Sequence, residues 1–524
     1  MEKFNGSTIY ETTSQPEEKN WRRWLIGRPL RTADEGEQAI SKKVGLAVFA
    51  SDAMSSTAYA TQEIMFILAA AGAGALGNVF PISIAIVGLM AMVVISYEQT
   101  IHAYPGGGGA YIVSRDNLGE LPAQTAGAAL LTDYILTVAV SISSGVAQIA
   151  SAFPVLYPYR VWIGVVLVFI IMLMNLRGVK ESGTAFAIPS YFFVVTMVIT
   201  VGVGLYRFFT GSLGTVVNPP EMMIEGAAAV VTPFLLLHAF SSGTAAMTGI
   251  EAVSNGVTAF KEPRSKNAGI TLLWMAAILA SLFMSISFLA SKIHAIPSEA
   301  ETVISQLART VYGGQGVFYL AIIAGTTVIL ILAANTAFAG FPRLGALQAA
   351  DGYLPRQLTL RGSRLVFSWG IVSLAILSSL LIIVFQASVT RLIPLYAIGV
   401  FLSFTLSQAG MSRRWWKSGR LQPGDEVKET GSFLRYDKRW LFKMIVNGFG
   451  ALCTFIVMIV FAVTKFHDGA WIVVFVIPAL VFMFFTIHRH YKQVAKRLSL
   501  DKYNERADVS RHRILVLIGG VHRG

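Results

Sequence analysis

The run from Phe49 to Tyr59 (FASDAMSSTAY) places an acidic side chain and a cluster of hydroxyls inside an apolar segment, Val44–Gly72. A carboxylate near the centre of a lipid bilayer costs at least about 2.5 kcal/mol on insertion scales. We therefore expect Asp52 to face a polar site inside the protein. Adjacent serines also weaken a helix, because their hydroxyls compete for backbone groups. The pattern predicts a break in this helix at Ser51–Ser56.

A second polar stripe lies in the apolar segment 124–150, where Asp133, Thr137 and Ser141 recur at i, i+4 and i+8. This spacing places a carboxylate and two hydroxyls on one face of a helix. For the two hydroxyls alone, hydrogen bonding between packed membrane helices is an equally good explanation. Asp133 on the same stripe favours a polar pathway.

A third polar pair, Thr248 and Glu251, lies in the apolar segment 228–258. Burial disfavours the charged form of a carboxyl group, so Glu251 is a candidate for carrying a proton. A structural hydrogen bond from a protonated acid to a nearby break in the backbone explains this residue equally well. Both interpretations stay open.

Two tyrosines and two further glutamates also lie in apolar segments. Tyr59 follows Asp52 by seven residues, so on a helix it would share the same face. Tyr396 taken alone is more typical of packing or of the aromatic belt at a membrane surface. We interpret Glu63 and Glu98 as structural or gating residues rather than as ligands.

The sequence contains no motif that is typical of an enzyme. The glycine-rich run Tyr104–Tyr111 (YPGGGGAY) lacks the Gly-Lys-Ser/Thr ending of a phosphate-binding loop, and neither a His-Glu-x-x-His nor a Gly-x-Ser-x-Gly motif is present. The single cysteine, Cys453, excludes intrachain disulfides and cysteine-based zinc clusters. We expect no catalytic activity and no cofactor beyond transported ions.

Carboxylate, hydroxyl and broken-helix carbonyl oxygens together form a shell that suits a metal cation, and the carboxyl ends of half-helices also favour positive charge. An amino acid substrate would instead need free backbone amides for its carboxylate. Asp52 would lie where that carboxylate has to sit and would repel it. The pattern favours cation transport, and these ligands do not choose K⁺ over Na⁺.

The composition places these residues in a membrane protein. Of the 524 residues, 54% are hydrophobic and 14% are charged, whereas soluble domains have about 25% charged residues. We predict twelve apolar spans of about 20 residues, each long enough to cross ~30 Å of hydrocarbon. These spans are 44–72, 79–103, 124–150, 160–176, 185–208, 228–258, 268–291, 317–341, 366–386, 391–411, 440–464 and 470–488.

The net charge of +13 is spread over many loops, which disfavours a nucleic-acid partner. Lys and Arg concentrate in alternate loops, for example Lys42 and Lys43 before the first span, Arg413 and Arg414 after the tenth, and Lys492 after the last. This alternation predicts that both termini lie in the cytoplasm. Residues 1–43 lack the apolar core of a secretory signal and are expected to form a cytosolic tail in a cell-membrane protein.

The chain contains a weak internal sequence repeat. Aligning Phe49 with Phe240 places Ser51 on Ser242 and Thr57 on Thr248. Interrupted helices at corresponding positions of two halves indicate a midplane binding site in inverted-repeat transporters. We expect two repeats, 44–208 and 228–411, followed by two further spans within 440–488.

The C-terminal segment 491–524 is polar and basic, and it contains one apolar stretch, Ile514–Gly520 (ILVLIGG). This stretch is typical of a buried strand that leads into a glycine turn at the start of an α/β domain. Since one strand cannot form a domain, we expect a truncated cytosolic module here.

Three of these motifs resemble a known family. Tyr104–Tyr111 (YPGGGGAY) is similar to the loop motif of amino acid–polyamine–cation transporters. Ser51–Tyr59 (SDAMSSTAY) and Thr248–Gly256 (TGIEAVSNG) resemble the first and sixth helices of the KUP-type potassium–proton symporters, most closely their KimA branch. The resemblance implies a LeuT-like five-plus-five inverted repeat of helices with helices 1 and 6 broken, and K⁺ uptake coupled to H⁺.

The resemblance also implies roles for individual residues. The K⁺ ligands would be Asp52, Tyr59, Asp133, Thr137, Ser141, Thr248 and Tyr396, the last within Pro394–Gly399 (PLYAIG). Glu251 would be the proton-coupling acid. The family further implies a homodimer formed through a C-terminal domain and control by cyclic di-AMP. The chain stops at the first strand of that domain, which puts both properties in doubt for this sequence.

Three other functions compete with this interpretation. An amino acid or amine permease of the same fold is the nearest rival, and it would be inhibited by cationic amino acids. A channel would conduct without any dependence on protons, but helices broken at the midplane argue against it. A membrane-embedded enzyme ranks last, because the sequence offers neither a nucleophile–base pair nor a metal cluster.

Overall fold

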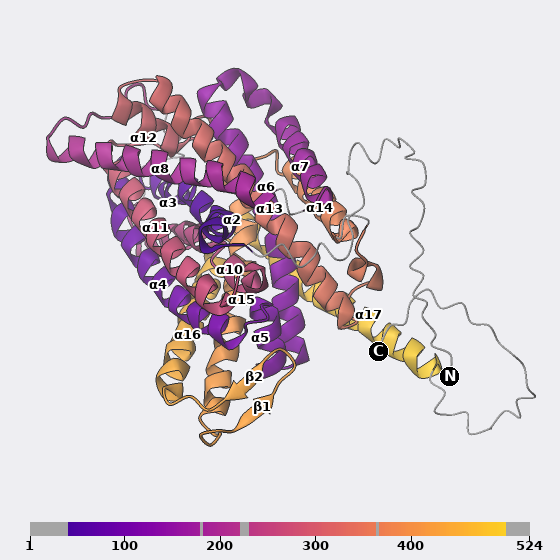
Figure 1. The fold of residues 1–524 in the computed structure, drawn as a ribbon. Coiled ribbons are helices and arrows are strands. Elements are labelled where there is room, and N and C mark those ends of the chain that lie inside the picture. Colours follow the sequence, from indigo (N-terminus) through magenta and orange to yellow (C-terminus); the bar gives the residue numbers. More distant parts are fainter. Residues whose placement is uncertain (1–39, 179–181, 221–229, 363–365, 499–524) are drawn as a thin grey trace, which may run out of the picture.

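The computed structural model describes residues 40–178, 182–220, 230–362 and 366–498 (Figure 1). The expected N-terminal tail up to residue 39 and the expected strand Ile514–Gly520 lie outside these residues. Long helices pack side by side, and a small hairpin lies at one end of the bundle. The helices are α2 (Lys42–Ser55), α3 (Ala60–Ala69), α4 (Val79–Ala103), α5 (Gly109–Asn117), α6 (Glu120–Ala152), α7 (Arg160–Leu176), α8 (Ser182–Phe209), α9 (Pro233–Gly243), α10 (Ala252–Asn255), α11 (Arg264–Lys292), α12 (Val303–Tyr312), α13 (Val317–Ala350), α14 (Ser368–Val384), α15 (Val389–Ser418), α16 (Trp440–Thr464) and α17 (Trp471–Leu498).

Within the described residues, nine helical segments are long and apolar enough to cross a membrane. Another predicted span, 366–386, coincides with α14, a shorter apolar helix of 17 residues. The remaining two, 44–72 and 228–258, coincide with segments that are divided into shorter helices. The prediction of a helical membrane protein is confirmed apart from one short hairpin of strands, whereas the count of twelve crossings stays a prediction.

The first divided segment consists of α2, the short 3₁₀ helix η2 (Ser56–Ala58) and α3. Its hydroxyls bond back to carbonyls three residues earlier, with Ser55 Oγ donating to Asp52 O at 2.6 Å and Ser56 Oγ to Ala53 O at 2.6 Å. Tyr59 then leaves the helical region with φ −125° and ψ −25°. The predicted break at Ser51–Ser56 is therefore placed too early, because such back-bonding is compatible with a helix and only tightens its end.

The second divided segment consists of α9, the 3₁₀ helix η6 (Thr244–Met247) and α10. Thr232 caps α9 by accepting a bond from the Leu235 amide at 3.1 Å. The chain becomes extended at Thr248 (ψ 150°) and left-handed at Gly249 (φ 79°). This break lies between Gly243 and Gly249, within the stretch that aligning Phe240 and Thr248 with the first segment indicates, although Ser242 still belongs to the last turn of α9.

The two breaks lie against each other in the middle of the bundle, where Figure 1 shows α2 beside α10. Ser56 Oγ donates to Ala246 O at 3.0 Å, which joins them directly. A Cβ atom at Gly249 would lie only 2.7 Å from the Ala53 amide nitrogen and 2.8 Å from Asp52 Cγ. Only glycine allows this approach. The close contact brings the non-helical backbone of the second break to the acidic side chain of the first.

A feature that the sequence did not predict is a hairpin between α15 and α16. Strands β1 (Glu426–Lys428) and β2 (Phe433–Arg435) pair antiparallel, with Val427 opposite Leu434. The hairpin lies at the end of the bundle beside α5 and α16 (Figure 1). Its turn contacts the end of α5, where the Gly431 amide donates to Asp116 Oδ2 at 3.0 Å, and it approaches the glycine-rich loop, where a Cβ atom at Gly431 would lie 3.6 Å from Tyr104 Cε1.

The buried Arg414 of α15 holds this hairpin in place. Its guanidinium donates to Glu429 Oε2 at 2.7 Å, to Ser432 Oγ at 2.8 Å and to Phe433 O at 2.9 Å. It also donates to the hydroxyl of Tyr104, at 3.2 Å. Burial raises the pKa of Tyr104 to about 12, although Arg414 opposes this shift, so the phenol stays protonated. We call these five residues the hairpin clamp.

The glycine-rich loop therefore has a structural role rather than a phosphate-binding one. Gly107 has φ 73°, and a Cβ atom there would lie 3.0 Å from Asn255 O at the end of α10. The loop thus packs its backbone directly on the divided sixth segment. Through this loop and the hairpin clamp, one end of the sixth segment is connected to α15 and α16.

Replacing Arg414 by Gln is expected to lower the free energy of unfolding by about 1.5–3 kcal/mol, because Glu429 loses its closest charged hydrogen-bond donor and keeps only Lys417, at 3.1 Å. Thermal or denaturant unfolding in detergent would measure this loss. Arg413→Gln is the matched control, since the neighbouring Arg413 is exposed. Equal unfolding of the two variants would contradict a stabilising role for the clamp.

Candidate functional site

Three buried carboxyl groups gather around the two breaks. Asp52 of α2, Asp133 of α6 and Glu251, next to α10, are 7%, 6% and 4% exposed. Asp133 interacts electrostatically with both other groups, and Asp52 interacts with Glu251. Three like charges cannot be buried together without compensation, because desolvation and repulsion both oppose it. The site therefore requires protons or a cation.

Asp52 is oriented by a residue that the sequence did not single out. Its Oδ2 accepts a hydrogen bond of 3.1 Å from Thr336 Oγ1, in the middle of α13. The same hydroxyl also donates to Ala333 O at 2.7 Å. The polar pair Asn335-Thr336, in the middle of a long and mostly apolar helix, is the signal that could have revealed it.

Tyr59 and Thr248 meet across the two breaks. The Tyr59 hydroxyl lies 3.4 Å from Thr248 Oγ1, and Thr248 Oγ1 donates to Ala245 O at 3.0 Å. Both side chains are buried. Each residue lies where its helix loses regular geometry. Backbone carbonyl oxygens near them therefore lack the regular hydrogen bonds of a helix.

The predicted stripe on α6 faces this region. Asp133 Oδ1 is buried and has no hydrogen-bond partner among the described residues. One turn later, Thr137 Oγ1 lies 2.9 Å from the Tyr396 hydroxyl of α15. Ser141, a further turn along, is 2% exposed. Tyr396, the weakest candidate on sequence grounds, is thus joined to the stripe by a direct contact.

Glu251 lies between three segments. Its Oε2 accepts a bond of 2.8 Å from Ser403 Oγ of α15 and a longer one of 3.4 Å from the Tyr97 hydroxyl of α4. Its Oε1 is buried without a partner among the described residues. Sequence reasoning missed Tyr97 and Ser403, because nothing in the pattern of α4 or α15 distinguishes them from packing residues.

Glu98 lies apart from this cluster, whereas Glu63 follows Tyr59 by one helical turn, with its amide donating to Tyr59 O at 3.0 Å. Glu63 is buried, accepts a long bond of 3.4 Å from Thr390 Oγ1 and interacts electrostatically with the buried Lys465. Glu98 lies near the end of α4, at 3.3 Å from His102 Nδ1. None of these side-chain contacts involves a predicted ligand. Their interpretation as structural or gating residues stays a prediction.

The arrangement suits an alkali ion better than a tightly held metal. Among the described residues, no three His, Cys, Asp or Glu side chains lie close enough together to hold a metal ion. Hydroxyl and backbone oxygens are instead interspersed between the carboxylates. Shells of this kind can replace the water around a K⁺ ion. The unpartnered Asp133 Oδ1 and Glu251 Oε1 are acceptors that a cation or a proton would satisfy.

Comparison with known proteins agrees with this chemistry. Residues 45–485 match the family described as "Amino acid permease". The chain is also 44% identical, over 501 residues, to a protein named "Potassium transporter KimA" from Bacillus subtilis (strain 168). That match covers 95% of this chain and 79% of the relative.

Proposed function

The chain belongs to the amino acid permease family, and on that premise we propose that it is a secondary transporter that imports K⁺ together with H⁺. The observation that carries the proposal is the burial of Asp52, Asp133 and Glu251 around two facing helix breaks. The relative named as a potassium transporter supports K⁺ as the transported ion. Coupling to H⁺ is our inference from the excess of buried carboxyl groups over one monovalent cation.

The proposed K⁺ site takes one oxygen or more from each segment around the breaks. Asp52 supplies the negative charge nearest to the exposed backbone of the sixth segment, as its contact with Gly249 implies. The hydroxyls replace part of the ion's water shell. The proposed ligands are Asp52, Tyr59, Asp133, Thr137, Ser141, Thr248 and Tyr396.

Glu251 is the proposed proton carrier. Its Oε2 is held by Ser403 and Tyr97, whereas its Oε1 has no partner among the described residues. Protonation would remove one of three adjacent charges and would change how the sixth segment packs on α4 and α15. Binding of the proton and of K⁺ are then linked, because each one stabilises the site against repulsion.

We propose that the two divided segments are helices 1 and 6 of a LeuT-like five-plus-five inverted repeat with twelve crossings. The divided segments would move against α6 to expose the site to each side in turn. We further propose a cell-membrane location with both termini in the cytoplasm, supported by the alternation of basic loops. The end of the bundle that carries the hairpin would then be cytoplasmic.

Two further properties are proposed only from the resemblance to KUP-type symporters. One is a homodimer formed through the C-terminal region, and the other is regulation by cyclic di-AMP through a domain in that region. Residues 499–524 lie outside the described chain, so the contacts of the bundle bear on neither property.

The alternative function is a proton-coupled amino acid or amine permease of the same fold. The description of the matched family favours it. The position of Asp52 beside Gly249 opposes it, because a substrate carboxylate bound at the break would meet a like charge. An amine without a carboxylate would not be repelled in this way.

Uptake of radioactive Rb⁺ into proteoliposomes tests the proposal. We expect uptake that is competed by K⁺ and that increases when the lumen is made alkaline relative to the outside. Uptake that ignores the proton gradient would remove the symport claim and leave K⁺ transport standing. Proton-driven uptake of lysine or putrescine, with no Rb⁺ uptake, would establish the alternative.

A further inference from the structure

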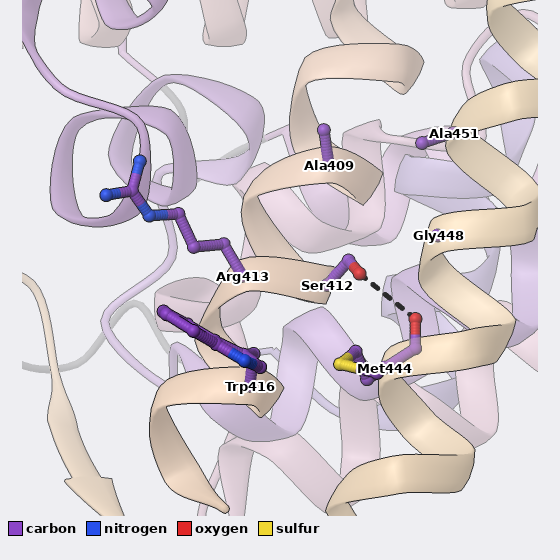
Figure 2. A pocket seen from close by; sticks show the side chains of 7 residues that line it. All are labelled: Ala409, Ser412, Arg413, Trp416, Met444, Gly448 and Ala451. Carbon is purple, nitrogen blue, oxygen red and sulfur yellow. Dashed lines mark hydrogen bonds between the residues drawn. The ribbon is translucent and has the colours of Figure 1, made fainter. Parts of the chain in front are cut away.

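A groove lies on the outside of the bundle between α15 and α16, at the end that carries the hairpin (Figure 2). Its volume is about 430 Å³, which is large enough to hold part of a lipid molecule rather than a single ion. Seven residues line it: Ala409, Ser412, Arg413, Trp416, Met444, Gly448 and Ala451. None of them belongs to the proposed ion site.

The groove changes character along its length. Figure 2 shows Trp416 and Met444 at one level, Ser412 and Gly448 at the next, and Ala409 and Ala451 beyond them. α15 approaches the hairpin as α16 leaves it, so the level of Trp416 is nearest the membrane surface. The groove is thus aromatic at the surface and becomes small towards the hydrocarbon, and the Arg413 side chain extends along its edge from the level of Ser412 towards that of Ala409 (Figure 2).

The edge of the groove carries positive charge that no described residue neutralises. Arg413 is exposed, and no hydrogen bond or ion pair of its side chain is found within the described residues. Trp416 is 41% exposed, and the guanidinium of Arg420 lies 3.5 Å from the centre of its ring. An arginine at this level can bind a phosphate through two hydrogen bonds, and tryptophan is favoured at the lipid headgroup.

The inner end of the groove is open to lipid. Nearby residues of α16 such as Ile445, Phe449 and Leu452 are exposed, as expected for a surface that faces acyl chains. A Cβ atom at Gly448 would lie 3.2 Å from Ser412 Oγ, so a larger side chain there would fill the groove. Ser412 Oγ donates to Met444 O at 3.1 Å (Figure 2), so the hydroxyl that lines the groove already has a hydrogen-bond partner.

We propose that this groove binds an anionic phospholipid, with its phosphate at Arg413 and Trp416 and one acyl chain along Ala409 and Ala451. The match is one of charge and polarity together: Arg413 along one edge, Arg420 over Trp416, and an apolar channel beside them. Basic pockets between membrane helices on the cytoplasmic side are typical sites for such lipids. A bound lipid would brace α15, which also carries Tyr396, Ser403 and the hairpin clamp.

Native mass spectrometry of the full chain, released from mixed micelles with equal phosphatidylglycerol and phosphatidylcholine, tests this site. We expect the wild type to retain phosphatidylglycerol about fivefold more than phosphatidylcholine, the preference that one basic side chain near the surface supplies. Arg413→Ala should remove the preference. Gly448→Leu should reduce retention of both lipids, because it fills the acyl channel.

Lys261→Ala is the matched control, since it removes one exposed positive charge that does not line the groove. It should retain phosphatidylglycerol as the wild type does. Wild-type retention in both groove variants would overturn the proposal. The proposal would also be overturned if the protein were a dimer and Gly448→Leu abolished the dimer without changing lipid retention. A second copy of the chain would then fill the groove. Lipid retention is measured independently of ion transport, so the result tests the lipid site separately from the proposed function.

Discussion

Replacing Asp52 by Asn is expected to abolish K⁺ binding and uptake. The change keeps the shape of the side chain, and the amide oxygen can still accept the bond from Thr336 Oγ1. It removes the negative charge that lies closest to the backbone of the sixth segment at Gly249. Breaking a buried charge pair costs about 3–5 kcal/mol, so affinity should fall at least about 100-fold.

Rb⁺ uptake over a range of concentrations, together with thermal stability in K⁺ and in choline, would measure this loss. K⁺ should raise the melting temperature of the wild type and leave that of Asp52→Asn unchanged, because only a bound ligand stabilises the folded state. Thr336→Val is the matched control. It removes the hydrogen-bond donor but keeps the charge, so it should weaken affinity only about 2–13-fold, as expected for a bond worth ~0.5–1.5 kcal/mol. An Asp52→Asn variant that still binds K⁺ would place the ion elsewhere.

The helices could be predicted from the sequence because hydropathy alone determines which segments can lie in lipid. The described helices follow the predicted spans closely, for example α4 at Val79–Ala103 and α16 at Trp440–Thr464. The breaks were predicted less accurately. Serine and threonine signal a weakened helix, but their position does not determine where it ends, since hydroxyls such as Ser55 Oγ bond to their own helix and prolong it.

The candidate site was predictable only where its residues are of a type that is rare in apolar segments. Asp52, Asp133 and Glu251 are carboxylates in apolar segments, and this alone marks them for attention. Thr336, Ser403 and Tyr97 were missed because hydroxyls are common in membrane helices, and their roles depend on which helix lies opposite. The clamp between Arg414 and Glu429 was missed for a related reason: the hairpin that creates it is short and has an exposed, unpatterned sequence.

Replacing Glu251 by Gln is expected to separate ion movement from proton movement. The amide is nearly isosteric, and its oxygen can still accept bonds from Ser403 and Tyr97, but it cannot take up or release a proton. Rb⁺ should still bind and exchange across the membrane. Its accumulation should no longer respond to an inward proton gradient, because the proton has lost its carrier. Counterflow of Rb⁺ against internal K⁺, compared with gradient-driven uptake in the same vesicles, would measure both properties.

Ser403→Ala distinguishes this role from a purely structural one. That variant loses the 2.8 Å bond to Glu251 Oε2 but keeps the titratable group, so its uptake should remain gradient-driven with a displaced pH dependence. If Glu251 only fastened the sixth segment to α15, Ser403→Ala would weaken folding, Glu251→Gln would not, and neither variant would change the coupling. If uptake by Glu251→Gln still followed the proton gradient, the proton would have to travel on another group. Asp133 would then be the first to test, because its buried Oδ1 also has no hydrogen-bond partner among the described residues and lies at the same site.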